Sequence, residues 1–153
     1  MRRRLGGITF AAGLPVAAAV VGSLGARSAP RVYDELEKPA WAPPASAFGP
    51  VWTILYGAIG VVGWRLWTRN APQSLLGLHA GQLALNAAWP IAFFAIRSRP
   101  ASLGVIVALD AAVAAEVAAT LRRDPAAAAL LSPYLLWCLF ATALNAAVQD
   151  PGA

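Results

Sequence analysis

Five long apolar segments, separated by short charged or proline-rich breaks, constrain this chain more than any other feature. A helix of roughly 20 apolar residues is long enough to cross a hydrocarbon core of about 30 Å. We therefore expect an all-α membrane protein, a five-transmembrane-helix bundle that forms a single domain over residues 1–153. The expected helices cover about residues 5–26, 50–67, 73–96, 101–121 and 126–148.

The composition supports the same class. Of the 153 residues, 59% are hydrophobic and 12% are charged, whereas a soluble domain usually carries about 25% charged residues. The net charge of +5 comes from arginines that lie beside apolar segments, where they anchor helices among lipid headgroups. We expect an integral, multi-pass protein whose partner is the lipid bilayer, and we do not expect nucleic acid.

The first segment has two interpretations. Three arginines, Arg2, Arg3 and Arg4, precede an apolar run that ends near Ala26, and a secretory signal peptide has the same layout. The length of the run favours a first transmembrane helix over a cleaved signal. Pro15 is expected to kink this helix.

Residues 27–49 form the longest polar connection. Pro39, Pro43 and Pro44 exclude a regular helix from that part of it and stiffen the chain. A rigid loop that carries Trp41 is suited to act as a lid over the bundle. Alternatively, Trp41 lies among the headgroups as an interfacial anchor, and the two roles are compatible.

The third segment contains a polar stripe. Gln82, Asn86 and Trp89 follow one another at i, i+4 and i+7, so a helix places them on one face. An amide that faces hydrocarbon has no hydrogen-bond partner. The stripe must therefore face the bundle interior or a cavity.

Few groups are available for metal binding or catalysis. The single cysteine, Cys138, and the single histidine, His79, stand in no metal-ligand spacing, so we expect no metal and no cofactor, and we interpret His79 as a helix-end polar residue. Asp110 and Glu116 lie within the fourth segment and are functional candidates for that reason. They are about 120° apart on a helix, so a structural hydrogen-bonding role is favoured over a proton relay.

Six tryptophans in so short a chain indicate an aromatic site. Trp64 and Trp67 lie at a segment end and are expected to be interfacial anchors. Trp52, Trp89 and Trp137 lie within segments or on a polar face, where a ligand pocket is expected. Aromatic walls with a few amides suit a flat, mainly apolar ligand.

Three blocks of the chain resemble the TspO/MBR family, which comprises tryptophan-rich sensory proteins and the translocator protein, or peripheral benzodiazepine receptor. The blocks are KPAWAPP at 38–44 with FGPVWTILY at 48–56, GQLALNAAWP at 81–90 with FF at 93–94, and PYLLW at 133–137 with FA at 140–141 and LN at 144–145. Their order and spacing extend over almost the whole chain.

The resemblance implies a five-helix bundle, usually a homodimer, that binds porphyrins such as protoporphyrin IX, with sterols and isoquinoline or benzodiazepine-type compounds as further ligands. The family pocket lies among helices one, two, three and five, under the first loop. The matching positions in this sequence are Trp41, Pro43, Trp52, Asn86, Trp89, Trp137, Ala141 and Leu144.

Three functions are compatible with this resemblance. The first is a membrane receptor or sensor for tetrapyrroles. The second is an enzyme that degrades porphyrin in light and oxygen, with Trp52 and Trp137 at the positions of the tryptophans implicated there. The third is a transporter of tetrapyrroles or sterols. A dimer contact is expected through the small residues Gly77, Gly81 and Ala84.

The chain departs from its relatives at three places. The end of the last segment, residues 146–150, lacks the tyrosine and the basic residue of the animal sterol-recognition pattern. Val32 stands where relatives often carry tryptophan, and a pocket tryptophan is missing near Ala101. A wider or less aromatic pocket is the expected consequence.

Overall fold

The computed structural model of the chain describes residues 2–149, and side chains from residue 4 onward. The described residues form helices and no strands, in the order α1 (Arg2–Ile8), η1 (Thr9–Gly13), α2 (Leu14–Gly25), α3 (Ala29–Glu35), η2 (Ala45–Ala47), α4 (Phe48–Thr68), α5 (Gln73–Pro90), η3 (Ile91–Ala95), α6 (Arg99–Leu121) and α7 (Pro125–Ala147). Of the short elements, η1 and η3 are π-helices and η2 is a 3₁₀ helix. The predicted all-α class is confirmed.

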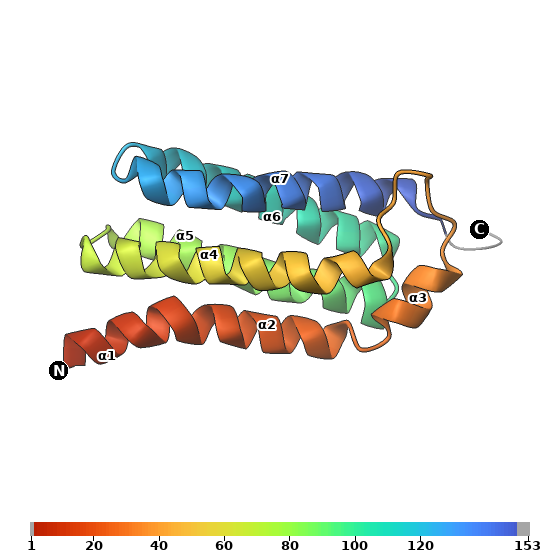
Figure 1. The fold of residues 1–153 in the computed structure, drawn as a ribbon, viewed down its shortest axis with the longest axis horizontal. Coiled ribbons are helices and arrows are strands. Elements are labelled where there is room, and N and C mark those ends of the chain that lie inside the picture. Colours follow the sequence, from red (N-terminus) through yellow and green to blue (C-terminus); the bar gives the residue numbers. More distant parts are fainter. Residues whose placement is uncertain (1, 150–153) are drawn as a thin grey trace.

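The long helices run side by side in a bundle (Figure 1). The first helical stretch, α1 to α2, packs on α5; α5 packs on α6, α6 on α7 and α7 on α4, and α4 closes the circle against η1 and α2. The short helix α3 lies across one end of the bundle, beside the C-terminal end of α7 (Figure 1). We call this the α3 end.

Four helical stretches among the described residues are long and apolar enough to cross a membrane: Arg4–Gly25, Ala45–Thr68, Arg99–Leu121 and Pro125–Ala147. α5 is not one of them, because polar residues such as His79, Gln82 and Asn86 interrupt its apolar sequence. Large apolar side chains on the four stretches point outward, as in Ile54 and Leu136. This arrangement suits a hydrocarbon environment.

Both π-helices lie next to a proline. Pro15 stands in the first turn of α2, directly after η1, and Pro90 ends α5, directly before η3. Proline cannot donate the i to i−4 hydrogen bond, and a π turn absorbs the disruption without ending the helix. The kink expected at Pro15 therefore takes the form of a π segment one turn earlier.

The connection between the first two spans contains more helix than the sequence predicted. α3 occupies its first part, with Pro30 in its first turn, where a missing N–H does no harm. Lys38 ends this helix, since its ammonium donates to the carbonyls of Tyr33 and Leu36. The segment from Pro39 to Pro44 is not helical, as expected, and α4 then begins at Phe48, two residues before Pro50.

The prediction that His79 is a helix-end residue is wrong. His79 lies within α5 and is fully buried, and its Nδ1 lies 2.6 Å from Oε1 of Glu116 on α6, which is also fully buried. The favoured hydrogen-bonding role of the two acidic residues is observed, because Asp110 also accepts a hydrogen bond of 2.7 Å from the Thr142 hydroxyl of α7.

A salt bridge fixes the turn between α6 and α7, at the end of the bundle opposite α3. Asp124 accepts two hydrogen bonds from the Arg65 guanidinium, of 2.8 and 2.7 Å, and caps α7 by accepting from the Ala127 N–H. The Arg65 hydrogen bonds lower the pKa of Asp124 to about 2.

Asp150 and Pro151, expected to follow the last helix as its stop, lie outside the described residues.

Candidate functional site

A cavity of about 570 Å³ opens in the bundle near the α3 end. Small-molecule sites in proteins commonly have volumes of about 300–1,000 Å³. Residues from all five long helical stretches except α6, together with α3, line it: Ala19, Gly22, Ser23, Ala26, Ala29, Pro30, Tyr33, Ala45, Phe48, Gly49, Trp52, Thr53, Tyr56, Asn86, Trp89, Pro90, Phe93, Phe94, Ala141, Leu144, Asn145 and Val148.

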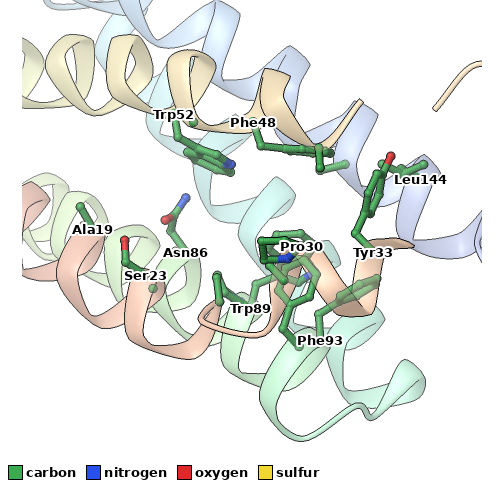
Figure 2. A pocket seen from close by; sticks show the side chains of 18 of the residues that line it. Ala19, Ser23, Pro30, Tyr33, Phe48, Trp52, Asn86, Trp89, Phe93 and Leu144 are labelled. Atoms are coloured by element: carbon green, nitrogen blue, oxygen red, sulfur yellow. The ribbon is translucent and has the colours of Figure 1, made fainter. Parts of the chain in front are cut away.

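The walls of the cavity are mainly aromatic. Figure 2 shows Trp52 and Phe48 extending from α4 toward the space, with Asn86 and Trp89 on the other side. The ring of Trp89 lies 5.4 Å from that of Phe93, between ring centroids, so α5 and η3 contribute a continuous aromatic surface. Rings in such contacts present broad apolar faces to a ligand.

Asn86 is the central polar group, and its orientation is fixed. Its Oδ1 accepts a hydrogen bond from the Tyr56 hydroxyl, and its Nδ2 donates to the Tyr134 hydroxyl at 2.9 Å. Tyr134, fully buried, donates in turn to Oε1 of Gln82 at 2.8 Å. A primary amide offers two N–H donors and two lone pairs. Asn86 thus retains one donor and one acceptor beyond these two bonds.

A second amide fixes the neighbouring indole. The Trp89 Nε1–H donates to Oδ1 of Asn145 on α7 at 3.0 Å, and both residues line the cavity. This bond joins α5 to α7 and holds the Trp89 ring in one orientation. The site therefore has two oriented amides in an otherwise apolar wall.

α3 closes one end of the cavity through Pro30 and Tyr33. The Tyr33 hydroxyl donates to the Pro43 carbonyl at 2.8 Å, and burial raises the pKa of this phenol. An ion pair of 3.0 Å joins Glu35 to Arg97, which follows η3. Hydrogen bonds to Arg31 and Arg97 lower the pKa of Glu35.

The polypeptide after α3 is tied to the end of α7. Glu37 and Gln149 exchange two backbone hydrogen bonds of 3.0 and 3.1 Å. Together with the Glu35–Arg97 pair, this bridge holds the α3 connection over the cavity.

Five of the eight positions predicted to bind ligand line the cavity: Trp52, Asn86, Trp89, Ala141 and Leu144. The other three do not line it. Trp137 packs behind Phe48, with 5.8 Å between ring centroids; Trp41 packs on Phe140 and is 51% exposed; and Pro43 touches the site through its carbonyl bond to Tyr33.

Several lining residues were not predicted as ligand contacts, although some of them had a visible signal. Tyr56 shares a helix face with Trp52, Phe93 belongs to a motif block, and Asn145 follows the predicted Leu144. Tyr33 and Pro30 gave no such signal, because their place depends on α3, a helix that the sequence did not predict in the connection.

Four other sequence candidates lie outside the cavity. Gln82 is fully buried and ties α5 to α7 through Tyr134. Gly77, Gly81 and Ala84 form an exposed strip along α5, and a Cβ added at Gly77 or Gly81 would have no atom within 4 Å. Within residues 2–149, no three His, Cys, Asp or Glu side chains gather as a metal site would require.

Comparison with known proteins identifies related chains. The sequence profile of the TspO/MBR family matches residues 11–150. The translocator protein of Homo sapiens is 43% identical over 121 residues, which is 75% of this chain and 71% of the human one. The tryptophan-rich protein TspO of Archaeoglobus fulgidus is 39% identical over 125 residues, covering 80% of this chain and 81% of that one.

A third relative is the tryptophan-rich sensory protein of Cereibacter sphaeroides, 35% identical over 113 residues that cover 74% of this chain and 72% of the relative. The family match extends from η1 to beyond the end of α7, and so includes every helix that lines the cavity. On these similarities and on its long apolar helices, the chain is an integral multi-pass membrane protein and belongs to the TspO/MBR family.

Proposed function

We propose that this protein is a membrane receptor or sensor that binds porphyrin-like tetrapyrroles in the cavity at the α3 end. Membership of the family supports a receptor, sensor or transporter role. The observation that carries the proposal is the pairing of Trp52 and Asn86 across a cavity of about 570 Å³ (Figure 2). A flat macrocycle has two apolar faces for the aromatic walls and a polar edge for the amides.

The lining favours this class over a strongly polar ligand. None of the lining residues carries a formal charge, and the amide nitrogen and oxygen of Asn86 retain one free donor and one free acceptor. A charge enclosed here would lose its hydration without gaining an opposite charge, so a porphyrin must bind with its macrocycle in the cavity and its propionate groups at the open edge. Isoquinoline and benzodiazepine-type compounds, which are flat and nearly uncharged, fit the same requirement and are proposed as further ligands.

Titration of the purified protein with protoporphyrin IX in the dark, followed by tryptophan fluorescence, tests the proposal. We expect saturable quenching with a 1:1 endpoint, and a Trp52→Ala variant that binds about ten- to a hundredfold more weakly. Trp41→Ala is the matched control, since Trp41 stands outside the cavity and is half exposed. Unsaturable quenching, or equal loss in both variants, would contradict the proposal.

Light- and oxygen-dependent degradation of the porphyrin is the second candidate. Trp52 favours it, because an electron-rich indole that lines the cavity can lie against an excited porphyrin. We expect loss of the porphyrin Soret absorbance in light and not in darkness, and Trp52→Phe should slow it more than Trp137→Phe, because Phe48 stands between Trp137 and the cavity. Binding without bleaching leaves the receptor role alone.

We also propose that α5, continued by η3, is the fifth membrane span. Together they cover residues 73–95, and the polar side chains that lower the hydropathy of α5 are turned inward, where His79, Gln82 and Asn86 are at most 3% exposed. Cysteine accessibility labelling tests this. With five spans, a cysteine in the α4–α5 turn at Ala71 and one at Ser98 should be labelled from opposite sides of the membrane.

The homodimer is proposed to form through the exposed strip of Gly77, Gly81 and Ala84. Small residues let helices approach closely within a bilayer, and among the described residues no atom lies within 4 Å of a Cβ added at Gly77 or Gly81. Gly81→Leu should leave monomers in crosslinking experiments, with porphyrin binding retained. Undiminished crosslinking of Gly81→Leu would refute this interface.

A further inference from the structure

A second hollow, which we call the seam groove, runs between the first helical stretch and α4. It has a volume of about 560 Å³ and lies between two candidate membrane spans, so it faces hydrocarbon. Apart from the Tyr56 hydroxyl and the Trp64 indole nitrogen, its side chains are entirely apolar. The lining residues are Ile8, Ala11, Ala12, Pro15, Val16, Ala19, Tyr56, Gly57, Gly60, Val61 and Trp64.

The groove exists because both of its walls contain glycine or alanine, whose side chains are too small to fill the space. α4 contributes Gly57 and Gly60, and the opposite wall contributes Ala11, Ala12 and Ala19. At Gly60 the backbones nearly touch, since an added Cβ would lie 2.9 Å from the Ala11 carbonyl oxygen. At Gly57 an added Cβ would have no atom within 4 Å, so the groove is open there.

Tyr56 and Ala19 line both the groove and the cavity. Ala19 is too small to divide them, so the Tyr56 side chain is the partition. Its hydroxyl donates to Oδ1 of Asn86, and its ring lies 5.7 Å from that of Trp52, between centroids. Across the boundary, an added Cβ at Gly22 would lie 3.9 Å from the hydroxyl, so α2 contributes no side chain there.

We propose that an apolar ligand reaches the cavity from the bilayer through the seam groove, and that Tyr56 is the gate. This inference rests on the proposed function of the cavity. A single half-buried side chain closes the passage, and one neutral hydrogen bond to Asn86 keeps it closed. An entering ligand that can hydrogen-bond to Asn86 replaces the bond that the displaced tyrosine gives up.

The proposal concerns rates rather than affinity, and it is tested by kinetics. The protein is reconstituted in phosphatidylcholine nanodiscs, and stopped-flow tryptophan quenching follows association of protoporphyrin IX. Transfer of bound porphyrin to excess empty vesicles follows dissociation, and protein-free nanodiscs give the rate of partition into lipid. Equilibrium titration of the same samples gives the dissociation constant.

Gly57→Leu narrows the open part of the groove, since a Cβ added there meets no atom within 4 Å and Gly57 is not among the cavity-lining residues. We expect association and dissociation to slow by the same severalfold ratio, with an unchanged dissociation constant and a smaller effect for Gly57→Ala. The matched control is Gly104→Leu, at an exposed α6 glycine whose added Cβ also meets nothing within 4 Å. It should leave both rates at their wild-type values.

Tyr56→Phe keeps the ring and removes the bond that closes the gate. Breaking one neutral hydrogen bond changes an equilibrium by about three- to tenfold, so the dissociation rate should rise by up to that ratio. The association rate should rise by less, because Asn86 also loses one of the two bonds that orient it. Faster exchange in Tyr56→Phe together with slower exchange in Gly57→Leu supports the route.

Four results would overturn it. Rates that Gly57→Leu does not change mean that the groove holds only lipid chains. A larger dissociation constant with an unchanged dissociation rate in Tyr56→Phe would mean that the groove is part of the binding site rather than a passage. A higher dissociation rate in Gly57→Leu would mean the same. Failure of the wild-type protein to bind porphyrin refutes the function of the cavity itself, and this result is recognised before any variant is measured.

Discussion

The two halves of the bundle are built from the same helices and differ in what fills the space between them. Asn86 and His79 both lie on α5, seven residues apart and so on nearly the same face. Asn86 faces a cavity and keeps hydrogen-bonding capacity for a ligand, whereas His79 is enclosed and bonded to Glu116.

The side chains of α4 account for this difference. Toward the α3 end, Phe48, Trp52 and Tyr56 hold the neighbouring helices apart and leave a cavity. Two turns further on, Gly60 and Gly63 let them close in: an added Cβ at Gly63 would lie 2.9 Å from Nε2 of His79. Large residues on one helix thus produce a cavity, and small residues on the same helix produce a packed core. Binding and stability should therefore respond to different substitutions.

Breaking the buried His79–Glu116 pair should have the largest effect on stability. Glu116→Ala leaves a fully buried imidazole without its partner, which costs about 3–5 kcal/mol. The midpoint of thermal unfolding in detergent measures this loss. At temperatures where the variant stays folded, porphyrin affinity should equal that of the wild type; an equal loss of affinity and stability would break the comparison between the halves.

The double variant His79→Leu with Glu116→Leu is the control for that experiment. Replacing both members of a buried polar pair by apolar residues of similar size removes the unpaired group and often restores stability. We expect most of the loss in Glu116→Ala to be recovered. A double variant as unstable as the single one would show that packing, rather than the bond, carries the effect.

Substitution of alanine for two glycines of α4 should change the free energy of unfolding in opposite directions. Gly63→Ala places a methyl group 2.9 Å from His79 Nε2 and 3.4 Å from the Ala11 Cα, so overpacking should cost about 1–3 kcal/mol. Gly57→Ala enters open space and should stabilise by about 0.5–1 kcal/mol, because alanine favours helix. Unfolding midpoints of the two variants measured side by side test this, and equal shifts would contradict the packing argument.

Removal of the Tyr134 hydroxyl should affect both stability and porphyrin binding, because this hydroxyl bonds to Asn86 at the cavity and to the buried Gln82. Tyr134→Phe leaves Asn86 Nδ2 and Gln82 Oε1 without their shared partner, which should cost about 1–3 kcal/mol in stability. Because Asn86 loses its orientation, porphyrin affinity should also fall by a few-fold. Ser132→Ala is a suitable control, since it removes a hydroxyl from the same helix, bonded to the Ala128 carbonyl and outside the cavity lining. Unchanged affinity in Tyr134→Phe would show that the amide needs no positioning.

The sequence predicted the helical class and much of the cavity wall. Periodicity alone placed Gln82, Asn86 and Trp89 on one inward face, and the resemblance supplied Ala141 and Leu144, which line the cavity. These predictions hold because the spacing of residues within one helix determines which of them share a face.

The remaining features depend on contacts between helices, which spacing along one helix does not reveal. The partner of His79 is 37 residues away, on a helix whose rotation relative to α5 the sequence leaves open. Trp137 was expected at the cavity, but Phe48 occupies the intervening layer. Likewise, α3 forms in a part of the connection for which no helix was predicted.

The smallest effect on stability is expected at the end of the bundle opposite α3, where Asp124 is paired with Arg65. The pKa of Asp124 in the folded protein is about 2, below its ordinary value of 3.8, because of the hydrogen bonds from Arg65. The folded state therefore binds this proton less readily than the unfolded chain, so the contribution is present above the ordinary pKa of 3.8 and is lost as the pH falls through about 2. Asp124→Asn, which can still cap α7, should lower the unfolding midpoint by a few degrees at pH 7 and by progressively less as the pH falls from about 4 through 2. Arg65→Gln should reduce the change of the unfolding midpoint with pH over the same range. If neither variant alters that pH profile, this salt bridge does not stabilise the end of the bundle opposite α3.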